Sequence, residues 1–429
     1  MFLAHSENRA GRVQSLADHL KAVAELAQRY AAEVHEELAE VAEVTALLHD
    51  FGKYRDEFQE YIRKARGASV ETHHAVYGAA LAFENCWLGP AFAIAGHHTG
   101  LQDRASLQAF VGDPKYKISA RLSRLRERFE REIGPIPQKI NEPSFVSRDA
   151  TKDEKKRCIE FYVRMLFSIL VDADFLDTAA HYEGELHQPQ TFNPEKLLQD
   201  LIAERDKKSR EGHLNEIRNQ IFEQCLKKAE RKPGLFSLTV PTGGGKTLAS
   251  MAFALAHAAK NNLRRVIVVI PYLSIIEQTA AQYRRIFDPQ AKGIVVESHS
   301  AVVVPESEEN GERSPLALAA ENWDAPIIVT TSVQFVESLF ANKPSRCRKL
   351  HNIARAVVVF DEAQTLPVYL LSPLLDALRE LRRNYGTSFL FSTATQPAFR
   401  RSTFLPEGFD KGEMHEIVEN PQELFRSLR

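Results

Sequence analysis

The feature that constrains this chain of 429 residues most is a glycine-rich octapeptide, Val240-Pro241-Thr242-Gly243-Gly244-Gly245-Lys246-Thr247. It follows a short apolar run over residues 235–240 and precedes a helix-favouring run over residues 248–259. Backbone N–H groups of such a loop can surround phosphate oxygens at a helix N-terminus, and Lys246 adds positive charge there. Thr247 is then placed to bind Mg²⁺. The sequence therefore predicts a nucleotide-binding loop that includes Thr242 and Gly243 to Gly245.

The residues after this loop read as an α/β domain. Apolar, strand-like runs are expected at residues 265–270, 327–330, 356–360 and 388–392, with helical patterns between them. Strands that alternate with helices indicate a doubly wound parallel sheet. Ligands of such sheets bind beyond the carboxyl ends of the strands, which is where the glycine loop falls.

Two adjacent acids follow one of these strands, in the run Phe360-Asp361-Glu362-Ala363-Gln364. Asp361 is suited to hold Mg²⁺ through water. Glu362 is suited to orient or deprotonate the attacking water. The pair therefore predicts nucleotide hydrolysis, with Glu362 as a catalytic residue.

The residues before the loop read as a helical domain over residues 1–187. Helical segments are expected at residues 38–48, 73–87, 90–98, 115–132 and 156–180, and no alternating strand pattern is evident. Pro189 and Pro194 mark the exit from this domain. We therefore expect a linker over residues 188–215 and a second domain over residues 216–429.

Histidines and aspartates carry the chemistry of the helical domain, in the order H, HD, H, HH, D. The candidate metal ligands are His19, His49, Asp50, His74, His97, His98 and either Asp172 or Asp174. Imidazole and carboxylate together suit Mn, Fe, Co or Ni, and one carboxylate such as that of Asp50 can bridge two ions. Two neighbouring ions are the arrangement that hydrolyses phosphodiesters. A lone histidine on an apolar helix is more often a packed residue, but five separate sites in this order argue against chance.

These residues resemble the HD phosphohydrolase superfamily, and specifically the HD nuclease domain of the CRISPR-associated type I helicase-nuclease. The resemblance implies the ligands named above, with His49 and Asp50 also catalytic. It favours His74 over His73, because His74 precedes Gly78 by four positions, and Asp174 over Asp172. It leaves Lys53 either as a residue that neutralises the scissile phosphate or as a solvated lysine after a helix end.

The second half resembles the first RecA-like lobe of a superfamily 2 helicase. Val240 stands where the strict phosphate-loop pattern has glycine, so the match is to the Thr-Gly-x-Gly-Lys-Thr variant. Gln220 stands where helicases place an adenine-reading glutamine, and Gln364 replaces a frequent histidine, which puts coupling to strand movement in doubt. The remaining matches are Pro271-Tyr272-Leu273 with Gln278, Thr330-Thr331-Ser332-Val333-Gln334 and Ser392-Thr393-Ala394-Thr395.

The resemblance implies a metal-dependent nuclease on single-stranded DNA, fused to an ATP- and Mg²⁺-dependent motor in CRISPR antiviral defence. Its substrate would be the displaced strand of an R-loop opened by a guide-RNA effector complex. The sequence stops at Arg429, after the first lobe, so a truncated chain that does not translocate is expected. Two other readings stay open: an HD-type nucleotide phosphohydrolase regulated by an ATPase lobe, and a non-enzymatic docking chain.

Composition fits a cytoplasmic protein. The net charge is −2 and 44% of residues are hydrophobic, which is ordinary for a soluble chain. The cysteines at 86, 158, 225 and 347 form no Cys-x-x-Cys pair, so neither a zinc ribbon nor a disulfide framework is expected. The N-terminus has no signal-peptide pattern, and no apolar run is long enough to span a membrane.

Overall fold

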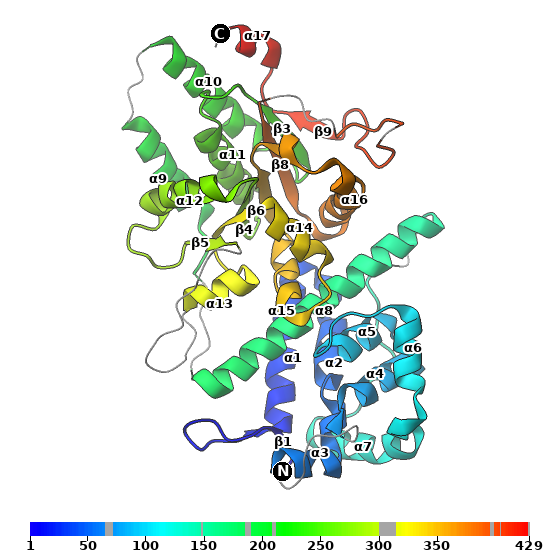
Figure 1. The fold of residues 1–429 in the computed structure, drawn as a ribbon. Coiled ribbons are helices and arrows are strands. Elements are labelled where there is room, and N and C mark those ends of the chain that lie inside the picture. Colours follow the sequence, from blue (N-terminus) through cyan, green and yellow to red (C-terminus); the bar gives the residue numbers. More distant parts are fainter. Residues whose placement is uncertain are drawn as a thin grey trace. The chain divides into compact units, whose positions relative to one another are not determined.

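The computed structural model describes residues 1–64, 72–146, 149–184, 190–207, 212–299, 315–394, 399–403 and 405–427. The chain forms two compact units (Figure 1). Unit 1 contains Met1–His187 and Ala341–His351, and unit 2 contains Gln188–Phe340 and Asn352–Arg429. In the described part of the chain, no helix is both long and apolar enough to cross a bilayer.

Unit 1 is helical, as expected. Its elements are α1 (Leu16–Val34), α2 (Ala39–Leu48), α3 (Asp56–Ile62), α4 (Ala75–Glu84), α5 (Leu88–Gly96), α6 (Arg104–Gly112), α7 (Ile118–Glu132), α8 (Lys152–Glu183) and α15 (Pro344–Cys347). A short antiparallel pair, β1 (Leu3–His5) and β2 (Gln14–Ser15), precedes α1. The five expected helical segments are present as α2, α4, α5, α7 and α8.

Two long helices form the frame of unit 1. α1 begins at Ser15, whose side chain accepts a hydrogen bond from the backbone of Asp18, and it buries apolar residues at three-to-four spacing. α8 begins with a capping box between Thr151 and Glu154. α1 packs against α2 and α8, and α5 packs against α4 and α8. This packing brings the ends of several helices to one place.

One glycine allows α2 and α4 to approach closely. A Cβ atom at Gly78 of α4 would lie 2.1 Å from the carbonyl oxygen of Leu48, the last residue of α2. Any side chain at this position would therefore push the two helices apart. Oδ1 of Asp50, two residues after Leu48, and Nε2 of His74, four residues before Gly78, lie 3.1 Å apart beside this contact.

Unit 2 is a parallel α/β fold, as expected. Its described strands pair in the order β5-β6-β4-β7-β8-β3-β9, all parallel. The strands are β3 (Leu235–Thr239), β4 (Arg265–Ile270), β5 (Val295–Ser298), β6 (Ile327–Thr331), β7 (Ala356–Phe360), β8 (Ser388–Thr393) and β9 (Met414–Glu416). β5 and β9 were not predicted from the sequence.

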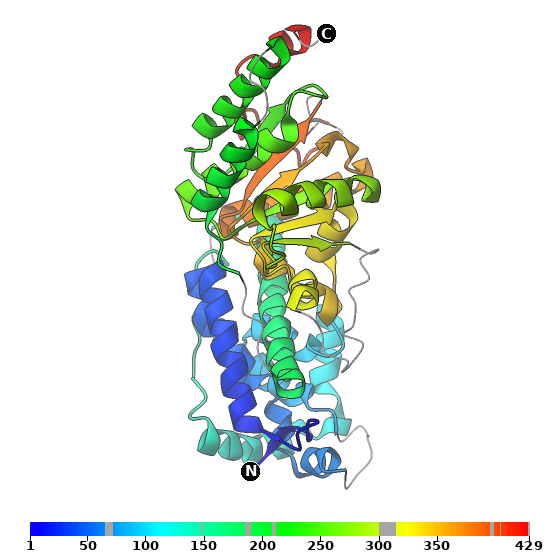
Figure 2. The same cartoon turned by 90° about the vertical axis from the view of Figure 1, so that its left-hand side faces the viewer.

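Helices cover both faces of this sheet. They are α9 (Pro194–Asp206), α10 (His213–Lys228), α11 (Lys246–Asn261), α12 (Leu273–Phe287), α13 (Pro315–Asn322), α14 (Ser332–Phe340), α16 (Val368–Tyr385) and α17 (Pro421–Ser427). Figure 2 faces the side that carries α9, α10 and α12, whereas α14 and α16 lie on the other side. Because both faces are buried, the central strands read as continuous apolar runs.

The segment 188–215, expected as a linker, contains a packed helix. Leu197 and Leu201 of α9 are buried in the apolar core of unit 2, against α10 and α11. The sequence signal was obscured because α9 has a charged exposed face and lies between proline-rich and polar stretches. We therefore place α9 within unit 2.

We predict that Gly78→Ala lowers the free energy of unfolding of unit 1 by about 1–3 kcal/mol, because the methyl group overlaps the Leu48 carbonyl. Of the two tryptophans, Trp87 lies in unit 1 and Trp323 in unit 2. Urea unfolding in a Trp323→Phe background, followed by fluorescence, therefore reports on unit 1.

Gly112→Ala is the matched control, because a Cβ atom at Gly112 of α6 meets no atom within 4 Å. It should leave the unfolding midpoint unchanged or raise it slightly. Equal midpoints for the two variants would contradict the close approach of α2 and α4.

Candidate metal centre and nucleotide site

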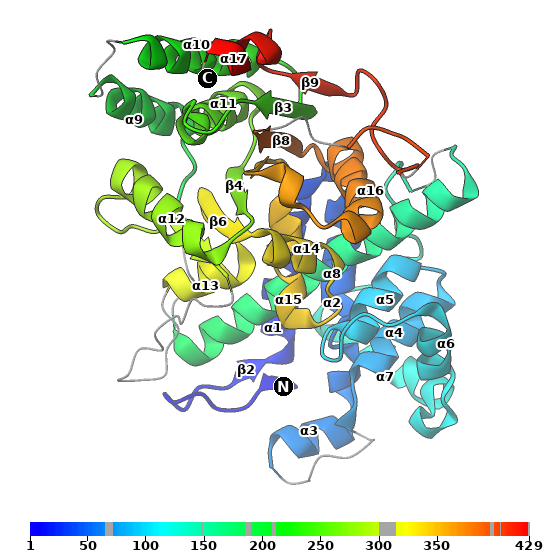
Figure 3. The same cartoon turned by 45° about the horizontal axis from the view of Figure 1, so that its top comes forward.

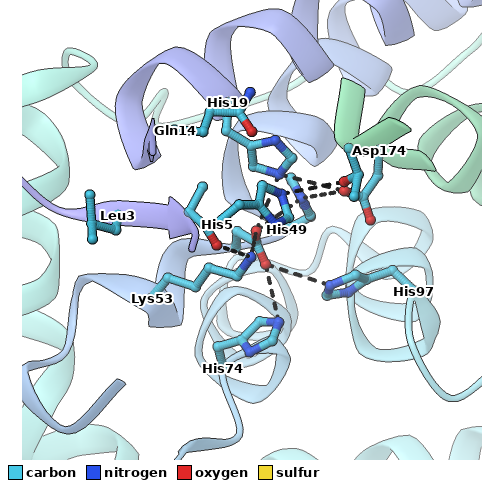
Figure 4. A network of polar contacts seen from close by, with 12 residues as sticks. Leu3, His5, Gln14, His19, His49, Lys53, His74, His97 and Asp174 are labelled. Carbon is cyan, nitrogen blue, oxygen red and sulfur yellow. Dashed lines mark hydrogen bonds and ion pairs between the residues drawn. The ribbon is translucent and has the colours of Figure 1, made fainter. Parts of the chain in front are cut away.

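Seven of the predicted ligands gather in unit 1 as two adjoining groups. Figure 4 shows five of them, His19, His49, His74, His97 and Asp174, around one centre. In each group the candidate ligand atoms lie within 4.8 Å of one another. The groups are His19, His49 and Asp174, and Asp50, His74, His97 and His98. They come from five helices or helix ends that are far apart in the sequence.

Helix ends orient two of the histidines. His49 and His97 are the C-cap residues of α2 and α5. The Nδ1–H of His49 donates to the carbonyl of Ala46 at 2.6 Å, and that of His97 donates to the carbonyl of Ile94 at 2.7 Å. Each bond satisfies a carbonyl at a helix end and leaves Nε2 facing the centre. Imidazoles that bind metals are commonly fixed in this way.

The carboxylate of Asp50 lies between the two groups. Its Oδ1 is 3.1 Å from Nε2 of His74 and 3.7 Å from Nε2 of His97. Its Oδ2 is 3.3 Å from Nε2 of His19 and 3.4 Å from Nε2 of His49. Because each oxygen faces a different group, Asp50 is placed to bridge two ions.

Several polar atoms of this centre call for a ligand. Among the described residues, the buried Nε2 atoms of His19, His49 and His97 have no hydrogen-bond partner, and Oδ1 of Asp50 has only the ion-pair contacts with His74 and His97. Leaving such atoms without a partner costs free energy, so they are rare in native proteins. Imidazole nitrogens that converge with carboxylate oxygens fit a divalent transition metal.

Charges in the centre shift its pKa values strongly. Burial lowers the pKa of His49, but the carboxylates of Asp50 and Asp174 outweigh it and raise that pKa to about 10. Burial opposes ionisation of Asp50, yet Lys53, His49 and His74 hold its pKa well below the usual range. Burial lowers the pKa of His74 to about 4. These shifts favour an ionised Asp50, a protonated His49 and a neutral His74, and a metal would compete with the proton for the nitrogen of His49.

Lys53 is part of the centre and not a solvated residue. Its side chain is buried, Nζ lies 2.6 Å from Oδ2 of Asp50, and Nζ donates to the carbonyl of Ala4 at 3.2 Å. The alternative that Lys53 is a solvated lysine was therefore wrong. Its charge lies where it can meet a phosphate or orient Asp50.

Two residues near the centre were missed in the sequence. Asp177 accepts a hydrogen bond from Nδ1 of His19 at 2.6 Å and another from Gln14 at 2.8 Å. The ring of His5 packs edge-on against that of His19, with centroids 4.8 Å apart. Asp177 follows Asp174 by three residues on α8, so helical spacing was an available signal. Nothing local in the sequence points to His5.

Asp172 is not in either ligand group. It is fully buried, and its Oδ1 accepts a hydrogen bond from Nε of Arg348 at 2.7 Å. Asp174, two residues later, lies 3.5 Å from His19 and 3.6 Å from His49. A shift of two positions on a helix turns a side chain by about 200°. The reading of Asp172 as the last ligand therefore does not match the structure.

The phosphate loop of unit 2 lines a cavity of about 470 Å³. Thr242, Gly243, Gly245, Lys246 and Thr247 contribute to its wall, together with Asp361 and Glu362 from the end of β7. Gly244 lies in the same turn, where its N–H donates to the carbonyl of Pro241. The predicted phosphate and Mg²⁺ residues are thus brought together.

The acids of this site are linked to the loop and to the next strand. Nζ of Lys246 lies 2.6 Å from Oε1 of Glu362, whose backbone is left-handed with φ of 47°. Gln364 donates to Oε2 of Glu362 at 2.7 Å and accepts from Oγ1 of Thr393 at 2.5 Å. Gln364 therefore connects Glu362 with the end of β8. Thr395 of the same motif lies outside the described residues.

Gln220 does not face this cavity. It is exposed, whereas Asn215, Arg218, Asn219 and Phe222 line the wall. These four follow the i, i+3, i+4, i+7 spacing of one face of α10, and position 220 falls off that face. The prediction of Gln220 as adenine reader does not match this arrangement.

The motifs expected to contact single-stranded DNA lie at the carboxyl edge of the sheet. Tyr272 and Leu273 follow β4, and Thr331 and Val333 are at the end of β6, its neighbour. Tyr272 is 55% and Val333 is 68% exposed. An exposed aromatic side chain at this edge suits stacking on a base, whereas Thr331 is buried.

Comparisons with known proteins match a different family model to each half of the chain. The HD domain family model matches residues 16–158, and the DEAD/DEAH box helicase family model matches residues 215–402. A relative from Haloferax volcanii, described as CRISPR-associated nuclease/helicase Cas3, is 26% identical over 444 residues, which cover 87% of this chain and 47% of that protein.

Two solved structures share this fold. T. fusca Cas3-ADP aligns with a TM-score of 0.58 and 19% identity over 91% of this chain and 50% of that chain. T. fusca Cas3-AMPPNP aligns with a TM-score of 0.59 and 18% identity over 92% and 50%. The chain therefore spans about half the length of the relatives that it matches.

We predict that Asn219→Ala weakens ATP binding about tenfold, because it removes a polar group from the cavity wall, whereas Gln220→Ala changes binding less than twofold. Lys246→Ala should abolish binding and serves as the reference for loss. Titration with a fluorescent ATP analogue measures all three. A larger effect at Gln220 than at Asn219 would restore the sequence-based assignment.

Proposed function

We propose, from the premise that this chain joins the HD domain and the helicase domain of a Cas3-type HD-helicase, that it is a metal-dependent nuclease for single-stranded DNA. The observation that carries the proposal is the carboxylate of Asp50, with one oxygen toward each of two ligand groups. A centre for two ions is the arrangement that phosphodiester hydrolysis uses.

The chain offers a distinct ligand set on each side of Asp50. One ion would be held by Oδ2 of Asp50 with His19, His49 and Asp174, and a second by Oδ1 of Asp50 with His74, His97 and His98. Nitrogen-rich sets of this kind favour Mn, Fe, Co or Ni. Bound divalent ions supply an activated water and neutralise charge that develops on a phosphodiester.

Residues around the ligands orient the centre and add charge. Asp177 fixes the ring of His19, so that Nε2 points toward Asp50 and Asp174. Lys53 holds a cation beside Asp50, where it can pair with a scissile phosphate. His98 is exposed and marks the side of the centre that DNA would approach.

We assign ATP and Mg²⁺ to the cavity of unit 2. Lys246 would exchange its contact with Glu362 for the phosphates, and Thr247 and Asp361 would hold Mg²⁺. Glu362 would orient the attacking water, and the Gln364 bridge would pass its movement to Thr393. A glutamine at position 364 is therefore compatible with coupling of hydrolysis to movement.

The proposed setting is CRISPR antiviral defence in the cytoplasm. The relative from Haloferax volcanii is described as CRISPR-associated. A guide-RNA effector complex that displaces one DNA strand would supply an accessible single-stranded substrate. All four cysteines are free thiols, as in a reducing compartment.

Cleavage of a circular single-stranded DNA tests the nuclease proposal. Metal-stripped protein is assayed with Mn²⁺, Co²⁺, Ni²⁺ or Mg²⁺, and transition metals should restore cutting. Loss of an outer-shell partner of a metal lowers activity about 10- to 100-fold. Asp50→Ala and His74→Ala remove ligands themselves, so each should lower the cleavage rate by more than that.

His73→Ala is the matched control, because His73 adjoins His74 but lies outside both ligand groups, with Nδ1 3.2 Å from the hydroxyl of Tyr116. It should cut like the wild type. Hydrolysis of nucleotides without any cutting of DNA would replace the proposal with a nucleotide phosphohydrolase.

A further inference from the structure

The segment Ala341–His351, called the brace segment here, belongs to unit 1 although its sequence lies far from the rest of that unit. It falls inside residues 215–402, which the helicase family model matches. Within unit 1 its short helix α15 packs against α8, the helix that carries Asp174 (Figure 3). The brace segment is thus helicase sequence built into the unit that holds the metal ligands.

Arg348 of the brace segment contacts two residues of α8 that flank Asp174 in the sequence. Its Nε donates to Oδ1 of Asp172 at 2.7 Å, and its guanidinium lies 3.7 Å from the ring centroid of Phe175. On a helix, positions 172 and 175 point about 160° and about 100° away from position 174, so Arg348 contacts a side of α8 other than the one that faces the ligands. Holding that side fixes the rotation of α8, so that Asp174 faces His19 and His49.

The brace segment also holds the peptide that follows His97 and His98. The carbonyl of Asn342 accepts a hydrogen bond from the N–H of Leu101 at 2.8 Å. Gly100, with φ of 104°, would place a Cβ atom 2.7 Å from that oxygen. This close approach ties the turn after both histidines to the brace segment.

A third contact reaches α1, which carries His19. The ring of His351 stacks on Tyr30 with centroids 5.2 Å apart, and its backbone N–H donates to Oγ of Ser168 at 3.0 Å. Three ligand-bearing elements therefore contact one short segment. General packing of a surface segment does not require contacts with each of these elements.

We propose that the brace segment is a structural part of the metal centre and that Arg348 is a positioning residue for Asp174. The inference rests on the proposed metal centre. Arg348 and Asp172 are 2% and 0% exposed, and replacing such a buried ion pair by apolar groups is often neutral for stability. Stability alone therefore does not explain why such a pair is buried here, and a role in geometry does.

Metal binding by the full chain tests this inference. Co²⁺ is titrated into metal-stripped protein, with calorimetry for affinity and visible absorption for ligand geometry. Arg348→Gln should weaken Co²⁺ binding about 10- to 100-fold, the range for outer-shell partners, and alter the absorption spectrum. Arg348→Lys keeps the charge but loses the planar stack on Phe175, so it should recover part of the affinity.

Arg265→Gln is the matched control, because Arg265 is a similarly buried arginine of unit 2 that pairs with Asp324 at 3.0 Å. It should lower thermal stability without changing Co²⁺ affinity or spectrum. If Arg348→Gln fails to fold, Arg348→Lys decides the question by the same two measurements.

If folded Arg348→Gln binds Co²⁺ with the affinity and spectrum of the wild type, the inference is wrong but the proposed metal centre stands. Folded Arg348→Lys takes its place if Arg348→Gln does not fold. A wild-type chain that binds no Co²⁺, Mn²⁺ or Ni²⁺ would overturn the proposed metal centre and the inference with it. The two failures are therefore distinguishable.

Discussion

Unit 1 is organised around one buried carboxylate, that of Asp50, which lies within 3.7 Å of the Nε2 atoms of four histidines. The helices end where they do because His49 and His97 cap carbonyls of their own final turns. The same bonds commit the other ring nitrogen of each histidine to the interior. A requirement of backbone chemistry and a requirement of metal chemistry are thus met by the same side chains.

In unit 2, too, a few side chains connect separate elements, here at the predicted nucleotide site. Lys246, Glu362, Gln364 and Thr393 form a continuous polar chain from the phosphate loop to the end of β8. A phosphate that draws Lys246 away would leave Glu362 free to reorient, and Gln364 would carry that change to the next strand. The glutamine thus connects the two ends of this chain of contacts.

The sequence was sufficient for the helical and α/β classes, and it picked out the seven residues that the structure brings together in two groups. Four of them, His49, Asp50, His74 and His97, lie at helix ends, whereas His19 and Asp174 lie within helices. The sequence was insufficient where the answer depends on a distant partner. Asp172 and not Asp174 pairs with Arg348, a residue 176 positions later in the sequence, and no local pattern predicts that partner. Gln220 matches a motif by its position in the sequence, but Asn219, and not Gln220, lies on the face of α10 that lines the cavity. α9 has too few buried positions to stand out, and only the core of unit 2 identifies it as a packed helix.

The brace segment bears on how such a protein can be divided or recombined. A gene cut between residues 187 and 215, just ahead of the helicase match, would separate Arg348 from Asp172 and leave a buried carboxylate without its counter-charge. A chimaera that joins the first half of one relative to the second half of another would pair a ligand-bearing helix with a foreign brace. Boundaries drawn from sequence families therefore differ from the boundaries along which this chain can be exchanged.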